Sequence, residues 1–203
     1  MDYIILASAS ARRQELLSQI GVRFTVRSQD IDESIRSGEL ANDYVTRMAQ
    51  EKAGSALNAL RVSEDSSDAV VLAADTSVVC DADVLGKPAN EADAVGMLRL
   101  LSGREHRVLS AVTLATQVKQ RTVLSESRVR FREINIDEAQ QYYRSGEPMG
   151  KAGAYAIQGY AAVFVEQLIG SYSGVMGLPL FETAQLLAEF SVPVQSTDSA
   201  VMK

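Results

Sequence analysis

Residues 6–21 read LASASARRQELLSQIG, and the rest of the chain is interpreted outward from this stretch. The apolar residues 3–6 before it predict a short strand. The spacing of Leu16, Leu17 and Ile20 predicts a helix that ends at Gly21. Small residues connect the two. The order strand, tight loop and helix is typical of the start of an α/β chain.

The first turn of the expected helix carries features of an anion site. A helix start exposes free N–H groups and the positive end of the helix dipole, and Ser8 and Ser10 add hydroxyls that cap it or contact an oxyanion. Arg12 and Arg13 are unusual there, because cations at this end are unfavourable by a few tenths of a kcal/mol or more. An external polyanion would remove the conflict, which indicates a phosphate site. The alternative is a solvated first turn in which Ser10 is an ordinary N-cap without a ligand.

Composition limits the function and compartment. The 203 residues suit one α/β domain, or two small lobes that share one sheet. A net charge of −6 argues against general affinity for nucleic acid or an anionic membrane. Cys80 is the only cysteine, which excludes an intramolecular disulfide and a multi-cysteine zinc site. We expect a cytoplasmic protein, since no apolar run is long enough to span a membrane and Met1-Asp2 leads directly into a strand.

Two segments after this stretch carry candidate site residues. The acidic residues of 30–33, which include Glu33, form either a solvated loop or a site for Mg²⁺ or Mn²⁺, which prefer hard oxygen ligands. A helix is expected from near Asn42. Lys52 follows Val45 by seven residues and Met48 by four, so it lies on the apolar stripe of that helix. It either extends its ammonium from the edge of the stripe to solvent or presents it to a cleft.

Residues 69–74, AVVLAA, form a continuous apolar run typical of a buried central strand. The run ends at Asp75 and Thr76. A carboxylate at the end of a buried strand is well placed for catalysis, because ligands of α/β sheets gather at strand ends. The alternative is a turn or cap aspartate, but residues 77–80 continue as strand and weaken it.

The remaining pattern places a lysine and a glutamine on loops. A hairpin turn at 81–83 leads to Lys87, which is restricted by Gly86 and Pro88. The glycine-rich loop 149–159 contains Gln158, whose amide has the donor and acceptor groups needed for a base edge; the alternative is a flexible connector. His106 is interpreted as structural.

Other elements are expected from periodicity, caps and turn residues. They are a strand at 23–27, helices at 91–101, 135–145 and 180–190, strands at 106–116, 121–133 and 163–169, a turn at 174–179, a polar loop at 61–68 and a polar tail from about 192.

The candidate cations match a triphosphate in charge. They are Arg12, Arg13, Lys52 and Lys87. Glu33 and Asp75 could hold one or two divalent ions beside them. No GxxxxGK[ST] sequence occurs, so the chain is not a P-loop NTPase.

Several motifs in order resemble the Maf-like nucleotide pyrophosphatases. They are LASASARRQELLSQIG, the Glu33 loop, EKA around Lys52, AADT at 73–76, LGKP at 85–88, LSG at 101–103, KAGAYAIQG at 151–159 and GLPL at 177–180. The resemblance covers residues 6 to about 190. It implies one Maf-like α/β domain over residues 1–203, similar to the inosine triphosphate pyrophosphatase fold. That fold has a long mixed twisted sheet flanked by helices, two lobes with a central cleft, and usually a homodimeric assembly.

The resemblance also implies an activity, hydrolysis of a nucleoside triphosphate to the monophosphate and pyrophosphate with Mg²⁺ or Mn²⁺. ADT at Asp75 together with AIQG at Gln158 resembles the subgroup that acts on dTTP and UTP, with a role in cleaning nucleotide pools. Relatives that act on 7-methyl-GTP resemble SDQ and SEG at these places.

Residue roles follow from the resemblance. Asp75 is the implied proton acceptor, and Glu33 and Asp75 the implied metal ligands. The implied phosphate-binding residues are Ser8, Arg13, Lys52 and Lys87, and the implied specificity residues are Arg12, Thr76 and Gln158.

The sequence departs from the family pattern at Ala11, where SxSPRR usually has proline. We expect alanine to loosen the loop modestly and to leave the anion site intact. Two other functions stay open: a 7-methyl-GTP pyrophosphatase, and a nucleotide-binding regulator of septum formation without turnover.

Overall fold

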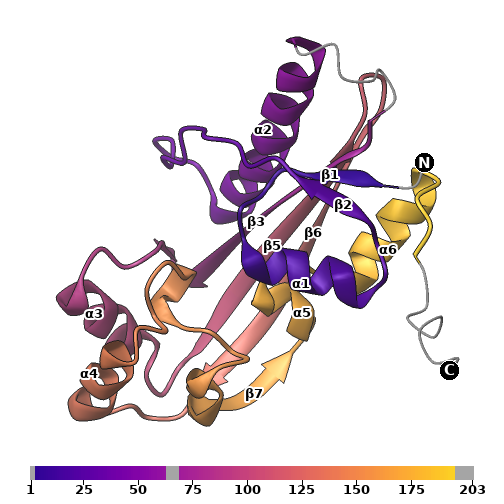
Figure 1. Cartoon of the computed structure of the whole chain (residues 1–203). Helices are drawn as coiled ribbons and strands as arrows, with labels where there is room; N and C mark the ends of the chain where they lie inside the picture. The colour runs from indigo at the N-terminus through magenta and orange to yellow at the C-terminus, as the bar shows by residue number, and fades with distance from the viewer. Residues whose placement is uncertain (1–2, 63–68, 195–203) are drawn as a thin grey trace, which may run out of the picture. The chain divides into compact units, whose positions relative to one another are not determined.

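The computed structural model describes residues 3–62 and 69–194 and shows a mixed sheet with helices around it (Figure 1). Its strands are β1 (Ile4–Leu6), β2 (Phe24–Val26), β3 (Val71–Cys80), β4 (Asp83–Leu85), β5 (Glu105–Ala115), β6 (Gln120–Phe131) and β7 (Val165–Ile169). Its α-helices are α1 (Ala11–Gln19), α2 (Ala41–Val62), α3 (Glu91–Leu101), α4 (Ile136–Arg144), α5 (Tyr172–Met176) and α6 (Leu180–Glu189), and its 3₁₀ helices are η1 (Ala152–Ala154) and η2 (Tyr160–Phe164).

The sheet has the order β2-β1-β3-β5-β6-β7, with β4 paired to β3. β1 runs parallel to β2 and to β3, with Ile5 opposite Val71. β4 and β7 run antiparallel to their neighbours β3 and β6. The expected fold class, a mixed sheet flanked by helices, is confirmed.

The described chain divides into two compact units. The first comprises the described residues of Met1–Asp75, Ala111–Leu124 and Gly177–Lys203, and the second comprises Thr76–Ser110 and Ser125–Met176. β3 passes from the first unit to the second between Asp75 and Thr76. The expectation of a single domain with a cleft stays a prediction. Among the described residues, no helix combines the length and the apolar character that crossing a bilayer requires.

The core of the first unit is made of small side chains. Alanines of α2 pack against β1, β3 and the end of β5, and the members of this cluster are Ile5, Ala7, Ala53, Ala56, Leu60, Val71, Ala73 and Ala115. Because alanine has a short side chain, α2 approaches the strands closely. Lys52 lies on the same helix beside these alanines, where its aliphatic stem is buried.

The core of the second unit is aromatic. Phe131 lies edge-on to Tyr155 with ring centroids 4.9 Å apart, and Phe164 lies edge-on to Tyr142 at 5.4 Å. Leu98 of α3 joins the same cluster. α3 and α4 lie side by side in this unit (Figure 1). Edge-to-face pairs add about 0.5–1.5 kcal/mol each beyond area burial.

Local sequence signals position the helix starts. Ser10 caps α1 by accepting a hydrogen bond from the Arg13 N–H, so Ala11 begins the helix without the family's proline. Asn135 and Glu138 form a reciprocal capping box at the start of α4. Both helix starts agree with the sequence prediction, because a cap is formed by residues close together in the chain.

Several boundaries differ from the prediction. The expected turn at 174–179 contains part of α5, which forms because Ser171 Oγ accepts a hydrogen bond from the Gly174 N–H at 3.0 Å. β7 begins at Val165 instead of 163 because η2 occupies the preceding residues. α2 extends to Val62, and residues 63–68 of the expected loop lie outside the described residues. Val192 is buried, and residues 195–203 of the expected tail are likewise not described.

Candidate active site

The N-terminus of α1 brings Ser8 and Arg13 together. The Arg13 guanidinium donates from Nη1 to Ser8 Oγ at 3.0 Å. It also donates from Nε to the backbone carbonyl of Gly177 at 2.9 Å. Two residues predicted to bind phosphate therefore form one cluster at a helix start, where backbone N–H groups and the helix dipole favour an anion.

Arg13 also interacts with two carboxylates of the first unit. Desolvation lowers the pKa of the Arg13 guanidinium, and the negative charges of Asp75 and Glu33 oppose that shift. The protein's own groups therefore relieve part of the conflict between this cation and the helix dipole. The sequence pattern assigned that relief to an external polyanion.

Arg12 interacts with a residue of its own helix. Its Nη1 forms an ion pair with Glu15, and its side chain is partly exposed. Such a pair on a helix surface contributes a few tenths of a kcal/mol. The bonds of Arg13 to Ser8 and Gly177, in contrast, tie its guanidinium to the backbone and to the loop before α1.

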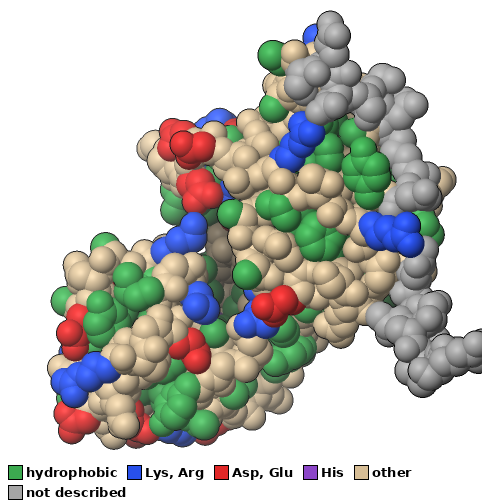
Figure 2. All heavy atoms as spheres, in the orientation of Figure 1, with side chains coloured by type: hydrophobic (Ala, Val, Ile, Leu, Met, Phe, Trp, Pro, Cys, Tyr) green, Lys and Arg blue, Asp and Glu red, His purple; other side chains and the backbone are tan. Residues whose placement is uncertain are grey.

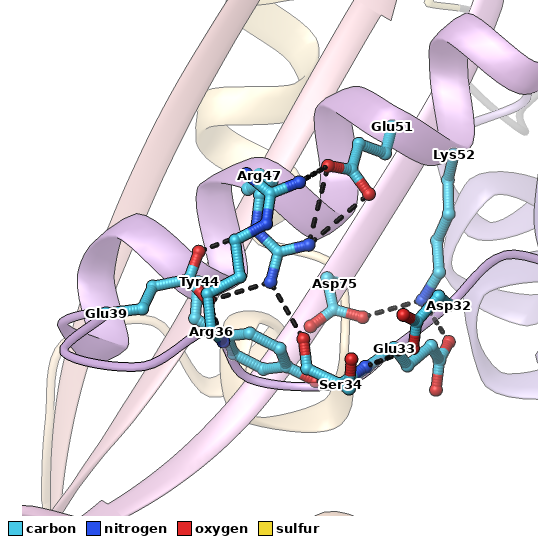
Figure 3. Close-up of polar contacts among 10 residues, drawn as sticks. All are labelled: Asp32, Glu33, Ser34, Arg36, Glu39, Tyr44, Arg47, Glu51, Lys52 and Asp75. Atoms are coloured by element: carbon cyan, nitrogen blue, oxygen red, sulfur yellow. Dashed lines mark hydrogen bonds and ion pairs between the residues drawn. The ribbon is translucent and has the colours of Figure 1, made fainter.

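Lys52 lies between the two predicted metal ligands (Figure 3). Its Nζ is 2.8 Å from Asp75 Oδ1 and 2.6 Å from Glu33 Oε1. The Lys52 side chain is 11% exposed and that of Asp75 is 14% exposed. Of the two interpretations of Lys52, extension to solvent is therefore wrong. The helix presents the ammonium inward, to a pair of acids.

The carboxylate pair fits a divalent cation in its donor chemistry. Within residues 3–62 and 69–194, no group of three or more histidine, cysteine, aspartate or glutamate side chains could hold a metal ion. Glu33 and Asp75 offer two hard carboxylates on one lysine. Mg²⁺ is usually bound by one or two carboxylates, with water and substrate phosphates completing the octahedron. Two carboxylates suit that kind of site.

Asp75 lies within a strand and not at the end of one. β3 is continuous from Val71 to Cys80, and Asp75 occupies its middle. The apolar run ends at Asp75, but the strand continues because residues 78–80 pair with β4. The expectation of a strand-end carboxylate is therefore wrong, although the weight given to residues 77–80 as strand is confirmed. Strand backbone on both sides fixes this side chain more firmly than a loop does.

Thr76, the next residue of β3, belongs to the second unit. Its Oγ1 is 3.0 Å from Ser110 Oγ, and Ser110 donates to the Gly174 carbonyl at 2.6 Å. Ser110 has a single proton and uses it on Gly174, so Thr76 is the donor in the first bond. This chain of bonds sets the rotamer of Thr76. Ser110 is buried in β5 and was missed from sequence, because a serine within a mainly apolar stretch carries no signal of its bonding partners.

Lys87 and the glycine-rich loop are linked through the backbone. Gly153 donates its N–H to the Gly86 carbonyl at 3.1 Å, next to the exposed Lys87. Gly153 has a φ of +66°, and a Cβ there would lie 2.9 Å from the side chain of Val78. Any larger residue would therefore strain the backbone and separate the loop from β3.

The segment that carries Gln158 is held by Tyr142 and Glu147. Tyr142 Oη donates to Glu147 Oε1 at 2.7 Å and accepts from the Ala156 N–H at 3.2 Å. Glu147 Oε2 accepts from the Tyr160 N–H at 2.9 Å. The loop is thus anchored on both sides of Gln158. These bonds favour an ordered loop over a flexible connector, and the role of the Gln158 amide stays a prediction.

His106 is buried in the second unit. Its Nε2 lies 2.9 Å from Tyr155 Oη, and its ring is edge-on to Phe131. Burial lowers the pKa of His106 to about 4. A neutral imidazole in an aromatic core agrees with the structural interpretation made from the sequence.

The surface charge is mixed on the face shown in Figure 2, where basic side chains lie among acidic ones. Over the part of this face that the structure describes, no single-sign patch dominates, and the contacts of Lys52 are short ones to Glu33 and Asp75.

Comparisons with known proteins agree with these motifs. A model of the Maf-like protein family matches residues 3–190. A dTTP/UTP pyrophosphatase of Hahella chejuensis (strain KCTC 2396) is 50% identical over 193 residues, covering 95% of this chain and 94% of the relative. Proteins of the same name from Cupriavidus metallidurans (strain ATCC 43123 / DSM 2839 / NBRC 102507 / CH34) and Methylococcus capsulatus (strain ATCC 33009 / NCIMB 11132 / Bath) are each 52% identical. Their matches cover 92% and 91% of this chain, and 96% and 89% of the relatives. The chain belongs to the Maf-like protein family.

Proposed function

We propose that the protein is a nucleoside triphosphate pyrophosphatase that hydrolyses dTTP and UTP to the nucleoside monophosphate and pyrophosphate. The names of relatives about half identical over nearly the whole chain support this substrate class. The observation that carries the chemistry is Lys52, whose ammonium contacts both Asp75 and Glu33. An ammonium suits a phosphate oxygen, and the two carboxylates beside it suit a divalent cation.

In this proposal Asp75 is the general base. A water oxygen attacks the α-phosphorus, the bond from that phosphorus to the bridging oxygen breaks, and pyrophosphate leaves with the electron pair. Asp75 accepts the proton that the water loses. In Figure 3 the second carboxylate oxygen of Asp75 carries no dashed contact to the ten residues drawn, while Oδ1 is held by Lys52. Lys52 orients the carboxylate through Oδ1, and the second oxygen is the one that we assign to accept the proton.

Cations neutralise the phosphate charge in the transition state. We assign this role to Arg13 and Lys52, with Ser8 orienting Arg13 through the 3.0 Å bond. Lys87 has the same role by family resemblance. Phosphoryl transfer needs charge neutralisation and in-line positioning more than covalent help. Loss of either cation should therefore lower kcat while the protein still folds.

A divalent cation, Mg²⁺ or Mn²⁺, is the proposed cofactor, held by Glu33 and Asp75. When bound, it polarises phosphate oxygens and lowers the pKa of coordinated water. Base selection is assigned to Arg12, Thr76 and Gln158. A homodimeric state and a cytoplasmic location remain predictions from sequence.

The test is a substrate panel. Purified protein is incubated with each NTP and dNTP and with 7-methyl-GTP, plus Mn²⁺ or Mg²⁺, and products are separated by chromatography. We expect dTTP and UTP to give monophosphate and pyrophosphate. Release of inorganic phosphate together with a nucleoside diphosphate contradicts the proposal. Preferred turnover of 7-methyl-GTP would show that the substrate is the methylated purine nucleotide and not dTTP or UTP. Tight nucleotide binding without hydrolysis identifies a binding regulator.

A variant pair tests the base. Asp75→Asn should abolish turnover while nucleotide binding is kept. Asp81→Asn is the matched control, because Asp81 lies exposed in the hairpin turn with a φ of +53°, which asparagine tolerates. A fully active Asp75→Asn variant removes Asp75 from the mechanism.

A further inference from the structure

The loop that carries Glu33 is held by two side chains of α2 (Figure 3). Tyr44 Oη donates to the backbone carbonyl of Glu33 at 2.9 Å. Arg47 Nη2 donates to the next carbonyl, that of Ser34, at 2.9 Å. Two consecutive carbonyls of an irregular segment thus bind side chains that lie one helical turn apart.

Arg47 is itself fixed by acidic residues. Its Nε and Nη2 pair with the two carboxylate oxygens of Glu39 at 2.5 and 2.7 Å, and its Nη1 lies 3.3 Å from Glu51 Oε2. The side chains of Arg47 and Glu39 are 13% and 9% exposed. A bidentate pair with little exposure is far more directional than a surface ion pair.

Glu39 extends the same network to the end of the loop. Its Oε2 accepts a hydrogen bond from the Arg36 N–H at 3.0 Å. At the other end, Asp32 Oδ1 accepts from the Ser34 N–H at 2.9 Å. The hydrogen bond from Arg47 is the main reason that the pKa of Glu39 falls to about 2, so this acid stays charged at neutral pH.

This arrangement matters because the Glu33 carboxylate lies on a segment without regular structure. The Glu33 side chain is 45% exposed, and residues 27–36 form neither helix nor strand. Lys52, which contacts that carboxylate, follows Tyr44 by eight residues on α2, an axial rise of about 12 Å. One helix therefore holds the Glu33 backbone at one point and its carboxylate at another.

We propose that Tyr44 and Arg47 are positioning residues that set the Glu33 carboxylate against Lys52 and Asp75. The inference rests on the proposed function, in which Glu33 serves the metal and phosphate site. Neither residue touches the reacting atoms. Sequence reasoning missed both, because Arg47 and Glu51 form an i,i+4 pair that is typical of an ordinary helix surface.

A double-mutant cycle separates positioning from general stability. The variants are Tyr44→Phe, Arg47→Lys and Glu33→Gln, alone and combined, with Tyr143→Phe and Arg61→Lys as matched controls. We expect Tyr44→Phe and Arg47→Lys each to lower kcat about 10-fold with KM changed less than about 3-fold, as for other supporting residues. In the Glu33→Gln background each should lower kcat less than about 2-fold, because the group that they position is gone.

A second readout does not depend on turnover. Amide hydrogen exchange should accelerate at residues 33–36 in Tyr44→Phe and Arg47→Lys, and stay at the wild-type rate in both controls. Unchanged exchange there, or losses of kcat that are equal with and without Glu33, would overturn the positioning role. If the wild-type protein hydrolyses no triphosphate, the proposed function fails, and exchange alone then decides whether α2 holds the loop.

Discussion

Replacement of Tyr142 by phenylalanine is the sharpest test of how the Gln158 loop is held. The change removes one oxygen and keeps the ring, which packs in the aromatic core of the second unit. Two hydrogen bonds are lost, one given to the Glu147 carboxylate and one taken from the Ala156 N–H. Ala156 is 5% exposed, so water cannot readily replace the missing acceptor.

The magnitude follows from these two losses. A hydrogen bond to a charged group contributes about 1.5–3 kcal/mol, and a buried N–H left without an acceptor costs about 1–3 kcal/mol. Both hydrogen bonds are made by the same hydroxyl oxygen, and the surrounding groups can relax, so the two costs do not add in full. We expect the free energy of unfolding to fall by about 3 kcal/mol. For a chain of this size that lowers Tm by about 6–12 °C.

The assay is urea unfolding followed by circular dichroism, with Tyr143→Phe as the control. Tyr143 is adjacent, less buried and makes no side-chain hydrogen bond among those identified in the described residues. The control should change the free energy of unfolding by less than about 0.5 kcal/mol. A Tyr142→Phe effect as small as that of the control would refute the reasoning.

The same variant should shift the titration of Glu147. Burial raises the pKa of this carboxyl, but hydrogen bonds from Tyr142 and from two backbone N–H groups outweigh it and hold the pKa below its ordinary value. Removing the Tyr142 hydroxyl should therefore raise the pKa of Glu147. Carboxyl chemical shifts followed by NMR across pH measure it, and an unchanged pKa contradicts the assigned bond.

Other expected outcomes concern pH, charge and backbone. The pKa of His106 is about 4 in the folded state against 6.5 ordinarily, so the unfolded chain binds more protons between these values and stability falls as pH drops through that window. Urea unfolding should show that the free energy of unfolding falls by about 2–3 kcal/mol from pH 6.5 to 4.5. His106→Gln should reduce this dependence on pH, and an equal dependence in the variant would exclude His106 as its cause. Lys52→Met should lower kcat/KM about 100-fold in the pyrophosphate-release assay, and near wild-type kinetics would exclude Lys52 from the site. Gly153→Ala should lower Tm by several degrees, because its φ is positive and Val78 blocks a Cβ; an unchanged melting curve would show that the loop readily shifts. Arg13→Lys should raise KM for all nucleotides alike, whereas Arg12→Lys should change the order in which nucleotides are preferred. The same order of preference in both variants would refute the assignment of Arg13 to the phosphates and Arg12 to the base.

Elements set by neighbouring residues could be predicted from the sequence. The caps at Ser10 and Asn135 depend on groups three residues away, and the periodicity of α2 placed Lys52 on its buried stripe. α5 was missed because Gly174 is typical of a turn, and its start depends on a Ser171 contact that composition does not reveal. Asp75 was placed at a strand end because its polarity interrupts an apolar run, while pairing between β3 and β4 carries the strand onward.

The sequence by itself determined which residue types could bind a triphosphate, since charge and donor chemistry belong to the side chains. It also determined the mixed α/β class, since the periods of strands and helices are local. Only the tertiary structure decided that Lys52 contacts both Glu33 and Asp75, groups 19 and 23 residues away along the chain. It alone decided that Tyr44 and Arg47 hold the Glu33 loop. Every residue has a backbone carbonyl, so the residue type at the accepting position does not indicate such a bond.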